Sequence, residues 1–300
     1  TPLVTSDWEV AYDQFVLPVS KNSWSGKPGK AGNTTFVVDK STGALKSLCL
    51  DGEELLASPI TLSLFRPATD NDNRDQNGAK LWRQAGLDHL TQKVVSLKEG
   101  KNKTTVKADI LNVEGKKIGN AEFIYALNRD GSMKVQTTFE PDTSLVKSMA
   151  RLGVTFEMKD TYENVTYLGR GEHETYTDRN QSGKIGIYKT TPERMFHYYV
   201  VPQSTGNRTD VRWLQLTDEH GKGCWIEANS FFQFSTVPFS DVILEKARHI
   251  NELKRDGKIT IHLDAEQAGV GTATCGPGVL PSYLVPLTKQ TFDFTIYPVK

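Results

Sequence analysis

The chain has 300 residues, and its 36 lysines and arginines balance its 36 aspartates and glutamates, so its formal net charge at pH 7 is zero. A neutral chain has no basic surface to attract nucleic acid, and no run of eighteen apolar residues predicts a membrane span. Cys49, Cys224 and Cys275 are odd in number and unpatterned, which argues against a disulfide framework and a cysteine-based metal site. We therefore expect neither nucleic acid nor a membrane as a partner.

The N-terminal segment differs in composition from the rest of the chain. Apolar and polar residues alternate up to Pro18, and residues 21–32 are rich in Ser, Lys and Gly, as in a linker. We expect residues 1–22 to be a connector or the tail of a preceding domain. Residues 23–300 then form one large domain whose first strand begins near Asn33. The chain starts without Met, so we expect it to be part of a longer soluble protein.

Short segments rich in β-branched and aromatic residues, separated by turns, dominate the remaining sequence. In the last of them Phe292, Phe294 and Ile296 alternate with polar residues, as in a strand with one buried face. Asp51-Gly52 and Asp130-Gly131 suit the positive φ angles of tight hairpins. The predicted strands are residues 34–40, 104–112, 121–127, 133–140, 148–158, 164–167, 231–239, 259–264 and 291–299.

Only one segment, residues 78–87, has helical spacing, with Leu81, Trp82 and Ala85 on one face. Many strands with one short helix predict an all-β protein built as a large antiparallel sandwich, and they exclude an alternating βα fold.

A first polar cluster directly follows the apolar run that ends at Phe65. It contains Arg66, Asp70, Asn71 and Asp72. So many polar side chains beside a predicted core must satisfy one another or a ligand. We favour a structural hydrogen-bonded network, although loops also carry function.

A second polar cluster, residues 168–179, follows the predicted strand 164–167. Glu174 could accept a proton from a ligand or pair with Arg179 at the start of a loop. His173 and its two glutamate neighbours cannot converge on one ion from a helix or a strand, so we expect no metal site. The candidate residues of this cluster are Glu174, Tyr176, Asp178 and Arg179.

Two further segments open from strand ends. Residues 199–208 contain Gln203 and Arg208, whose amide and guanidinium donors suit sugar hydroxyls. Residues 268–278 are glycine-rich but lack the Lys-Ser/Thr and the following helix of a phosphate-binding loop. This glycine-rich loop fits better as a flexible loop over a neighbouring site. No serine nucleophile elbow or zinc motif is present.

Taken in order, these motifs resemble the C-terminal domain of glycoside hydrolase family two β-galactosidases, in register over residues 33–300. Residues 9–18 resemble the end of the immunoglobulin-like domain that precedes it there. The resemblance implies an antiparallel β-supersandwich like that of the galactose mutarotases. The motifs that carry it are residues 65–72, 81–87, 167–171 with Glu174, Tyr176, Asp178 and Arg179, 199–206, 232–234 and 269–271.

The resemblance also implies an accessory role. The catalytic glutamates of that family lie on a separate barrel domain, and this chain lacks the βα alternation from which a barrel is built. We therefore expect no catalytic residue and no cofactor in this chain. The family often uses magnesium and sodium on its other domains. The implied partners are upstream domains of the same chain and a β-galactoside substrate, within a homo-oligomeric enzyme. The sequence leaves the compartment open between the bacterial periplasm and the cytoplasm.

In that family the glycine-rich loop reaches the active site and can carry a Trp on which a sugar stacks. The resemblance makes Gly271, Thr274 and Cys275 candidates for the substrate rim, with Cys275 nearest to the Trp position. A thiol offers little stacking surface, so we expect a β-galactoside other than lactose, or another hexoside, as the substrate.

Two other functions remain open on the sequence. One is a mutarotase-like epimerase, with Glu174 as the base and His173 as the acid. The other is a carbohydrate-binding module. Adjacent residues on a strand point in opposite directions, which counts against His173 and Glu174 acting together.

Overall fold

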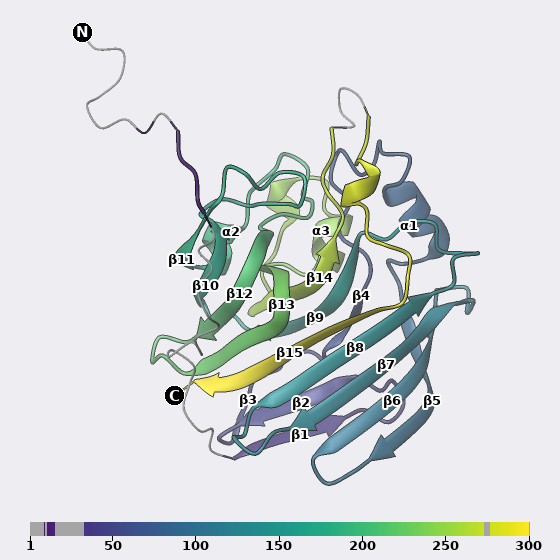
Figure 1. Ribbon diagram of the computed structural model, residues 1–300, viewed down its shortest axis with the longest axis vertical. Coiled ribbons are helices and arrows are strands. Elements are labelled where there is room, and N and C mark those ends of the chain that lie inside the picture. The colour runs from purple at the N-terminus through teal and green to yellow at the C-terminus, as the bar shows by residue number, and fades with distance from the viewer. Residues whose placement is uncertain (1–8, 10, 16–32, 273–276, 300) are drawn as a thin grey trace.

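The computed structural model describes residues 9, 11–15, 33–272 and 277–299. They form two antiparallel sheets with short helices around them (Figure 1), so the predicted all-β fold is confirmed. Within these residues, no helix is long and apolar enough to cross a membrane.

The small sheet has three strands and the large sheet has twelve. The small sheet contains β1 (Thr34–Val38), β2 (Leu45–Leu50) and β3 (Glu53–Glu54). The main path of the large sheet runs through β11 (Lys184–Thr190), β10 (Asn164–Gly171), β12 (Arg208–Thr217), β13 (Gly223–Val237), β15 (Gln290–Val299), β8 (Met133–Pro141), β7 (Lys117–Leu127), β6 (Lys103–Leu111) and β5 (Thr91–Glu99). A branch adds β14 (Lys258–Gln267), β9 (Arg151–Lys159) and β4 (Thr61–Ser63).

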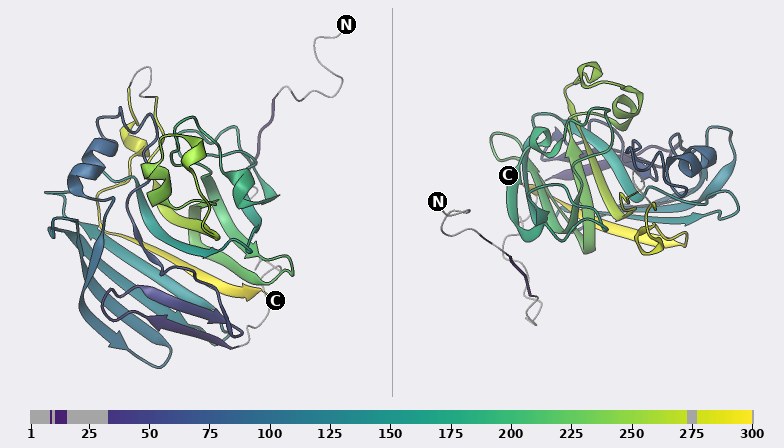
Figure 2. Two further views of the ribbon diagram at one scale, coloured as in Figure 1. Left: turned by 180° about the vertical axis from the view of Figure 1, so that it is seen from behind. Right: turned by 90° about the horizontal axis from the view of Figure 1, so that it is seen from above.

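The long strand β13 is the point where the large sheet divides. Its residues 223–228 pair with β15, and its residues 233–237 pair with β14. The sheet therefore continues from β13 as two wings, as Figure 1 shows. One wing runs through β15, β8, β7 and β6 to β5, and the other contains β14, β9 and β4. Seen from behind, the small sheet covers one face of the wing that contains β5 to β8 (Figure 2).

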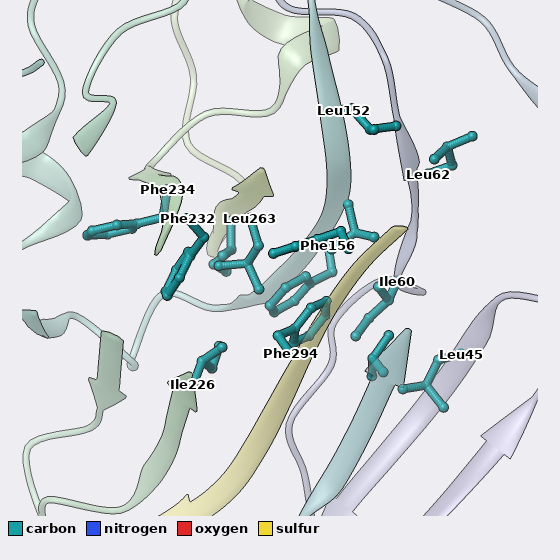
Figure 3. Close-up of a cluster of buried hydrophobic side chains, with 14 of the residues drawn as sticks. Leu45, Ile60, Leu62, Leu152, Phe156, Ile226, Phe232, Phe234, Leu263 and Phe294 are labelled. Atoms are coloured by element: carbon teal, nitrogen blue, oxygen red, sulfur yellow. The ribbon is translucent and has the colours of Figure 1, made fainter. Parts of the chain in front are cut away.

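The hydrophobic core lies where the two wings and the small sheet meet. Figure 3 shows side chains from β2, β4, β9, β13, β14 and β15 packed against one another. Phe156, Phe234 and Phe294 are at most 2% exposed. Because burial of apolar surface stabilises a fold by about 25 cal/mol per Å², this shared core is what holds the two wings together.

Within the described ranges, three short α-helices lie beside the sheets. The predicted helix is present as α1 (Ala79–Ala85) and ends at Gly86, whose φ of 71° is the left-handed conformation of a helix C-cap. The structure adds α2 (Pro192–Met195) and α3 (Asp241–Lys246), each with a Thr or Ser side chain capping its N-terminus. Helices of four and six residues are too short to show periodicity, so the prediction of one helix missed them. Two 3₁₀ turns, η1 (Ile250–Glu252) and η2 (Pro281–Tyr283), complete the elements.

The described part of the N-terminal segment lies against the outer edge of β11. The Gln14 side chain donates to the carbonyl of Ile185 (2.9 Å) and accepts from its N–H (2.6 Å). Lys184 contacts the carboxylate of Glu9 at 2.6 Å. Since β11 pairs with β10 alone among the described strands, this segment covers backbone groups that an edge strand otherwise exposes. Residues 16–32 lie outside the described residues, so the boundary at residue 22 stays a prediction.

Candidate functional site

Four loops gather at one end of the large sheet, and we call this region the loop end. Their described residues are 65–78, 172–183, 197–207 and, on either side of residues 273–276, 268–272 and 277–281. Side chains link them in pairs: the first loop bonds to the third and fourth, and the second loop bonds to the same two. In Figure 1 the described flanks of the glycine-rich loop lie at the top beside the loop that precedes α1. The polar clusters that are separate in the sequence therefore form one region in space.

Arg66 is fully buried at the centre of the loop end. Its guanidinium makes two hydrogen bonds to the carboxylate of Asp72, at 2.7 and 3.0 Å. It also donates to the carbonyls of Ala268 (2.7 Å) and Gly269 (2.9 Å) and to Oε1 of Gln267 (3.3 Å). All five N–H donors of Arg66 are thus satisfied by the protein, as a buried guanidinium requires.

Glu174 is the most extensively bonded carboxylate at the loop end. Its oxygens accept from Tyr199 Oη (2.6 Å), Arg179 Nη2 (2.9 Å), Thr205 Oγ1 (2.8 Å) and the N–H of Gly206 (2.9 Å). Burial alone would raise the pKa of Glu174, but these donors outweigh it and hold the pKa below the ordinary value. Burial, followed by the bond to Glu174, raises the pKa of Tyr199 to about 12. Glu174 is therefore an ionised structural anchor, poorly suited to act as a base.

The flanks of the glycine-rich loop are bonded to the first two loops. Asp178 accepts from the N–H groups of Val270 (3.0 Å) and Gly271 (2.7 Å). Asn71 donates to the carbonyls of the same two residues, at 2.9 and 3.0 Å. Asp75, which the sequence analysis did not single out, accepts from the N–H of Val279 at 2.8 Å.

The other candidates of the polar clusters have structural contacts, with one exception. Arg208 is buried and donates to Tyr167 Oη (2.9 Å) and to the carbonyl of Glu172 (2.6 Å). Tyr176 is buried between the guanidinium groups of Arg66 and Arg179, which lie 5.8 and 5.6 Å from its ring centre.

Gln203 and Asp70 meet through one hydrogen bond, because Gln203 is buried and its Oε1 accepts the N–H of Asp70 at 3.3 Å. The carboxylate of Asp70 is exposed and takes no hydrogen bond within the described part of the chain, so Asp70 stands outside the network that Asp72 belongs to.

Of the three rim candidates, Gly271 lies within the described residues. Gly271 lies at the base of the glycine-rich loop with φ of 62°, and an added Cβ would come within 2.9 Å of the N atom of Val279. Thr274 and Cys275 lie outside the described residues. Of the other cysteines, Cys224 is buried, which raises the pKa of its thiol to about 12, as expected for a small hydrophobic residue.

The pair suggested for an epimerase has other partners. His173 is exposed and its Nε2 lies 2.7 Å from Ser182 Oγ, while Glu174 is occupied by four donors. Among the described residues, no group of three or more His, Cys, Asp or Glu side chains is placed to hold a metal ion.

A second buried polar group lies beside the loop end, and the sequence analysis missed it. Arg151 and Asp264 are almost fully buried and pair at 3.6 Å, and Gln267 donates to Asp264 at 3.2 Å. His262 Nε2 lies 3.1 Å from the carboxylate of Asp241. Burial raises the pKa of Asp264. These residues sit on β9, β14 and α3, where single polar residues within apolar strands carried no visible pattern.

Glu174→Gln is expected to remove part of the acid sensitivity of the fold. A carboxylate with a depressed folded-state pKa stabilises the native state above its unfolded pKa, here about 4.5, and loses that contribution as the pH falls through the folded value. At pH 7 the variant should be less stable by about 1–3 kcal/mol, because donors lose their acceptor. The difference should shrink below about pH 4.5. Urea denaturation at pH 7, 5 and 3.5 measures it, and a constant difference would contradict this role.

Comparisons with known proteins agree with the motifs. The sequence model described as "Beta galactosidase small chain" matches residues 30–297. A β-galactosidase of Priestia megaterium is 30% identical over 291 residues, which cover 90% of this chain and 28% of the relative. A β-galactosidase of Kluyveromyces lactis is 30% identical, with coverage of 87% and 26%. The chain therefore spans about a quarter of the length of these relatives.

Solved structures with a similar course of the chain include a GalM/aldose epimerase homologue from C. elegans. Its TM-score is 0.46 at 12% identity, and the match covers 88% of this chain and 98% of that chain. On the match of its sequence from residue 30 to residue 297, the chain belongs to the β-galactosidase small chain family.

Proposed function

We propose that the chain is the non-catalytic C-terminal domain of a retaining β-galactosidase of glycoside hydrolase family two, and that its loop end completes the rim of a sugar site formed by another domain. One observation carries the absence of catalysis. Retaining hydrolysis needs two carboxyl groups about 5–5.5 Å apart, one free to attack and one free to transfer a proton. At the loop end, both oxygens of Asp72, Asp75, Glu174 and Asp178 accept hydrogen bonds from the protein.

The exposed surface of the loop end supports a role in contact with another domain. Val200 is 86% exposed, Leu280 is 57% exposed and Tyr198 is 44% exposed. All three lie on loops of the loop end, next to groups that fix those loops in place. Exposed apolar side chains that form a patch are typical of surfaces that meet a partner, and Tyr198 and Val200 lie two positions apart on one loop. The proposed partners are upstream domains of the same chain, with a β-galactoside bound where they meet.

The proposal also assigns the metal cofactors to domains other than this one. Magnesium and sodium, where the full-length enzyme uses them, bind on other domains in this proposal. The oxygens of four loop-end carboxylates, those of Asp72, Asp75, Glu174 and Asp178, already serve as acceptors for N–H and O–H donors, which supports this view.

The proposal is tested by shortening the glycine-rich loop in the full-length enzyme. Thr272 Oγ1 donates to the carbonyl of Pro277 at 2.7 Å, so the two flanks already touch. Replacing residues 273–276 with two glycines therefore leaves the base of the loop in place. We expect kcat/KM for a disaccharide galactoside to fall about tenfold, the loss typical of one missing pocket contact. The melting temperature should be unchanged, and full kcat/KM in a well-folded variant would exclude the loop from the site.

A further inference from the structure

The base of the glycine-rich loop is fixed by side chains from other loops. We call its two flanks, residues 269–272 and 277–280, the loop base. Gly269 receives a hydrogen bond from Arg66 through its carbonyl (2.9 Å), and its own N–H donates to the carbonyl of Tyr283 (2.9 Å). The first flank directly follows β14, yet beyond Gln267 no strand pairing continues. Beyond the backbone bond from Gly269 to Tyr283, the position of this flank depends on the side chains that reach it.

The peptide groups of the first flank are bonded from two sides. Asp178 accepts both N–H groups of Val270 and Gly271, and Asn71 donates to both of their carbonyls. These two residues thus receive four hydrogen bonds from side chains more than 90 positions away in the sequence. A carboxylate that accepts two backbone N–H groups is a strong, charge-assisted anchor.

The second flank has a matching anchor. Asp75 is 7% exposed, and its carboxylate accepts from Val279 (2.8 Å) and from Asn77 (2.9 Å). It therefore ties the loop base to the turn that precedes α1.

Glycines make room for both carboxylates. A Cβ added to Gly269 would come within 2.4 Å of the Asp178 carboxylate, and one added to Gly278 within 2.3 Å of the Asp75 carboxylate. No side chain fits at either place without displacing the acid. The two glycines and the two acids therefore form one matched arrangement.

We infer that Asp178 and Asp75 are positioning residues that hold the loop base ready for a β-galactoside, an inference that rests on the proposed function above. Neither acid belongs to the sheet ladder or to the hydrophobic core, and the contacts of both acids reach the loop base. A loop that is ordered in advance spares the bound substrate the entropy of ordering it. The loss of an anchor should then raise KM and leave kcat unchanged, because in the proposed function the catalytic groups lie on another domain.

The inference predicts a change in backbone protection that can be measured on this chain. Asp178→Asn and Asp75→Asn keep the shape of each side chain and replace one acceptor oxygen with an NH₂ donor. Hydrogen exchange at the N–H groups of Val270, Gly271 and Val279 should rise on the order of tenfold. Asn71→Ala is a milder second variant that removes the bonds to the carbonyls. Asp70→Asn is the matched control, since its carboxylate is exposed, and it should leave exchange unchanged.

Kinetics of the full-length enzyme complete the test. For the anchor variants we expect KM for a disaccharide galactoside to rise about two- to tenfold, with kcat within about twofold of the parent. One outcome is that the anchor variants show faster exchange with an unchanged KM, while the enzyme with residues 273–276 shortened loses kcat/KM. In that case the two acids stabilise the structure of the loop base but do not affect substrate binding. That result overturns the inference and leaves the proposed function standing. If the shortened enzyme keeps its full kcat/KM, the proposed function fails and the inference fails with it.

Discussion

Asp72→Ala is expected to lower the free energy of unfolding by about 3–5 kcal/mol, the cost of removing one partner of a buried ion pair. The variant leaves the guanidinium of Arg66, which is 0% exposed, with its charge and two of its N–H donors unpaired. It also frees the N–H of Thr69, which donates to Asp72 at 2.9 Å. Urea denaturation monitored by tryptophan fluorescence measures the change.

Asp70→Ala is the matched control, two positions away on the same turn. Because the Asp70 carboxylate is exposed, we expect a change within about 0.5 kcal/mol. Equal losses of unfolding free energy in the two variants would contradict the view that, of Asp70 and Asp72, Asp72 belongs to the buried network and Asp70 does not.

Trp82→Ala should produce a comparable loss, about 3–5 kcal/mol, through a cavity in the core. Trp82 is 1% exposed, packs edge-on to Phe65 with ring centres 6.2 Å apart, and donates from Nε1 to Ser148 (3.1 Å). Its ring also lies 5.5 Å from the guanidinium carbon of Arg66, so it joins α1 to the loop end.

Gln84→Ala serves as the control for Trp82, because Gln84 is exposed on the same helix and should change stability by less than about 0.5 kcal/mol. Thermal and urea unfolding compare the two. A loss below about 1 kcal/mol for Trp82→Ala would mean that α1 is only loosely attached to the core.

The elements that the sequence predicted best are those with one buried and one exposed face. In β15 the alternation of Phe292, Phe294 and Ile296 matches buried positions in the structure. Asp51 and Gly52 have φ angles of 55° and 86°, so this predicted tight turn is confirmed. Such elements carry their environment in their own pattern.

Other elements left no such pattern. The alternation in β12 is interrupted where Trp213 and Leu214 follow one another, both buried, and β4 has only three residues. Bulges also shift the register of β12 against β13 on either side of Val211. A strand that is irregular or buried throughout cannot be separated from other apolar segments by period alone.

In the candidate site, the sequence pattern likewise did not predict contacts between residues that are far apart in the chain. The sequence identified Arg66 and the glycine-rich loop as separate features, but Arg66 and Gly269 are 203 residues apart and meet only in the fold. Asp75 was missed because its role depends on Val279, 204 positions away. Local patterns predict which residues are unusual, whereas their partners are set by the topology of the sheet.

The most direct test of the central claim is the hydrolysis of a chromogenic nitrophenyl β-galactoside by the purified chain. With both oxygens of Glu174, Asp178, Asp75 and Asp72 already used as acceptors, we expect no turnover above the buffer rate, while a full-length β-galactosidase assayed in parallel is active. The chain should show a cooperative thermal transition in the same buffer, so that inactivity reflects missing catalytic groups. Turnover that stays with the chain through further purification steps would contradict the account.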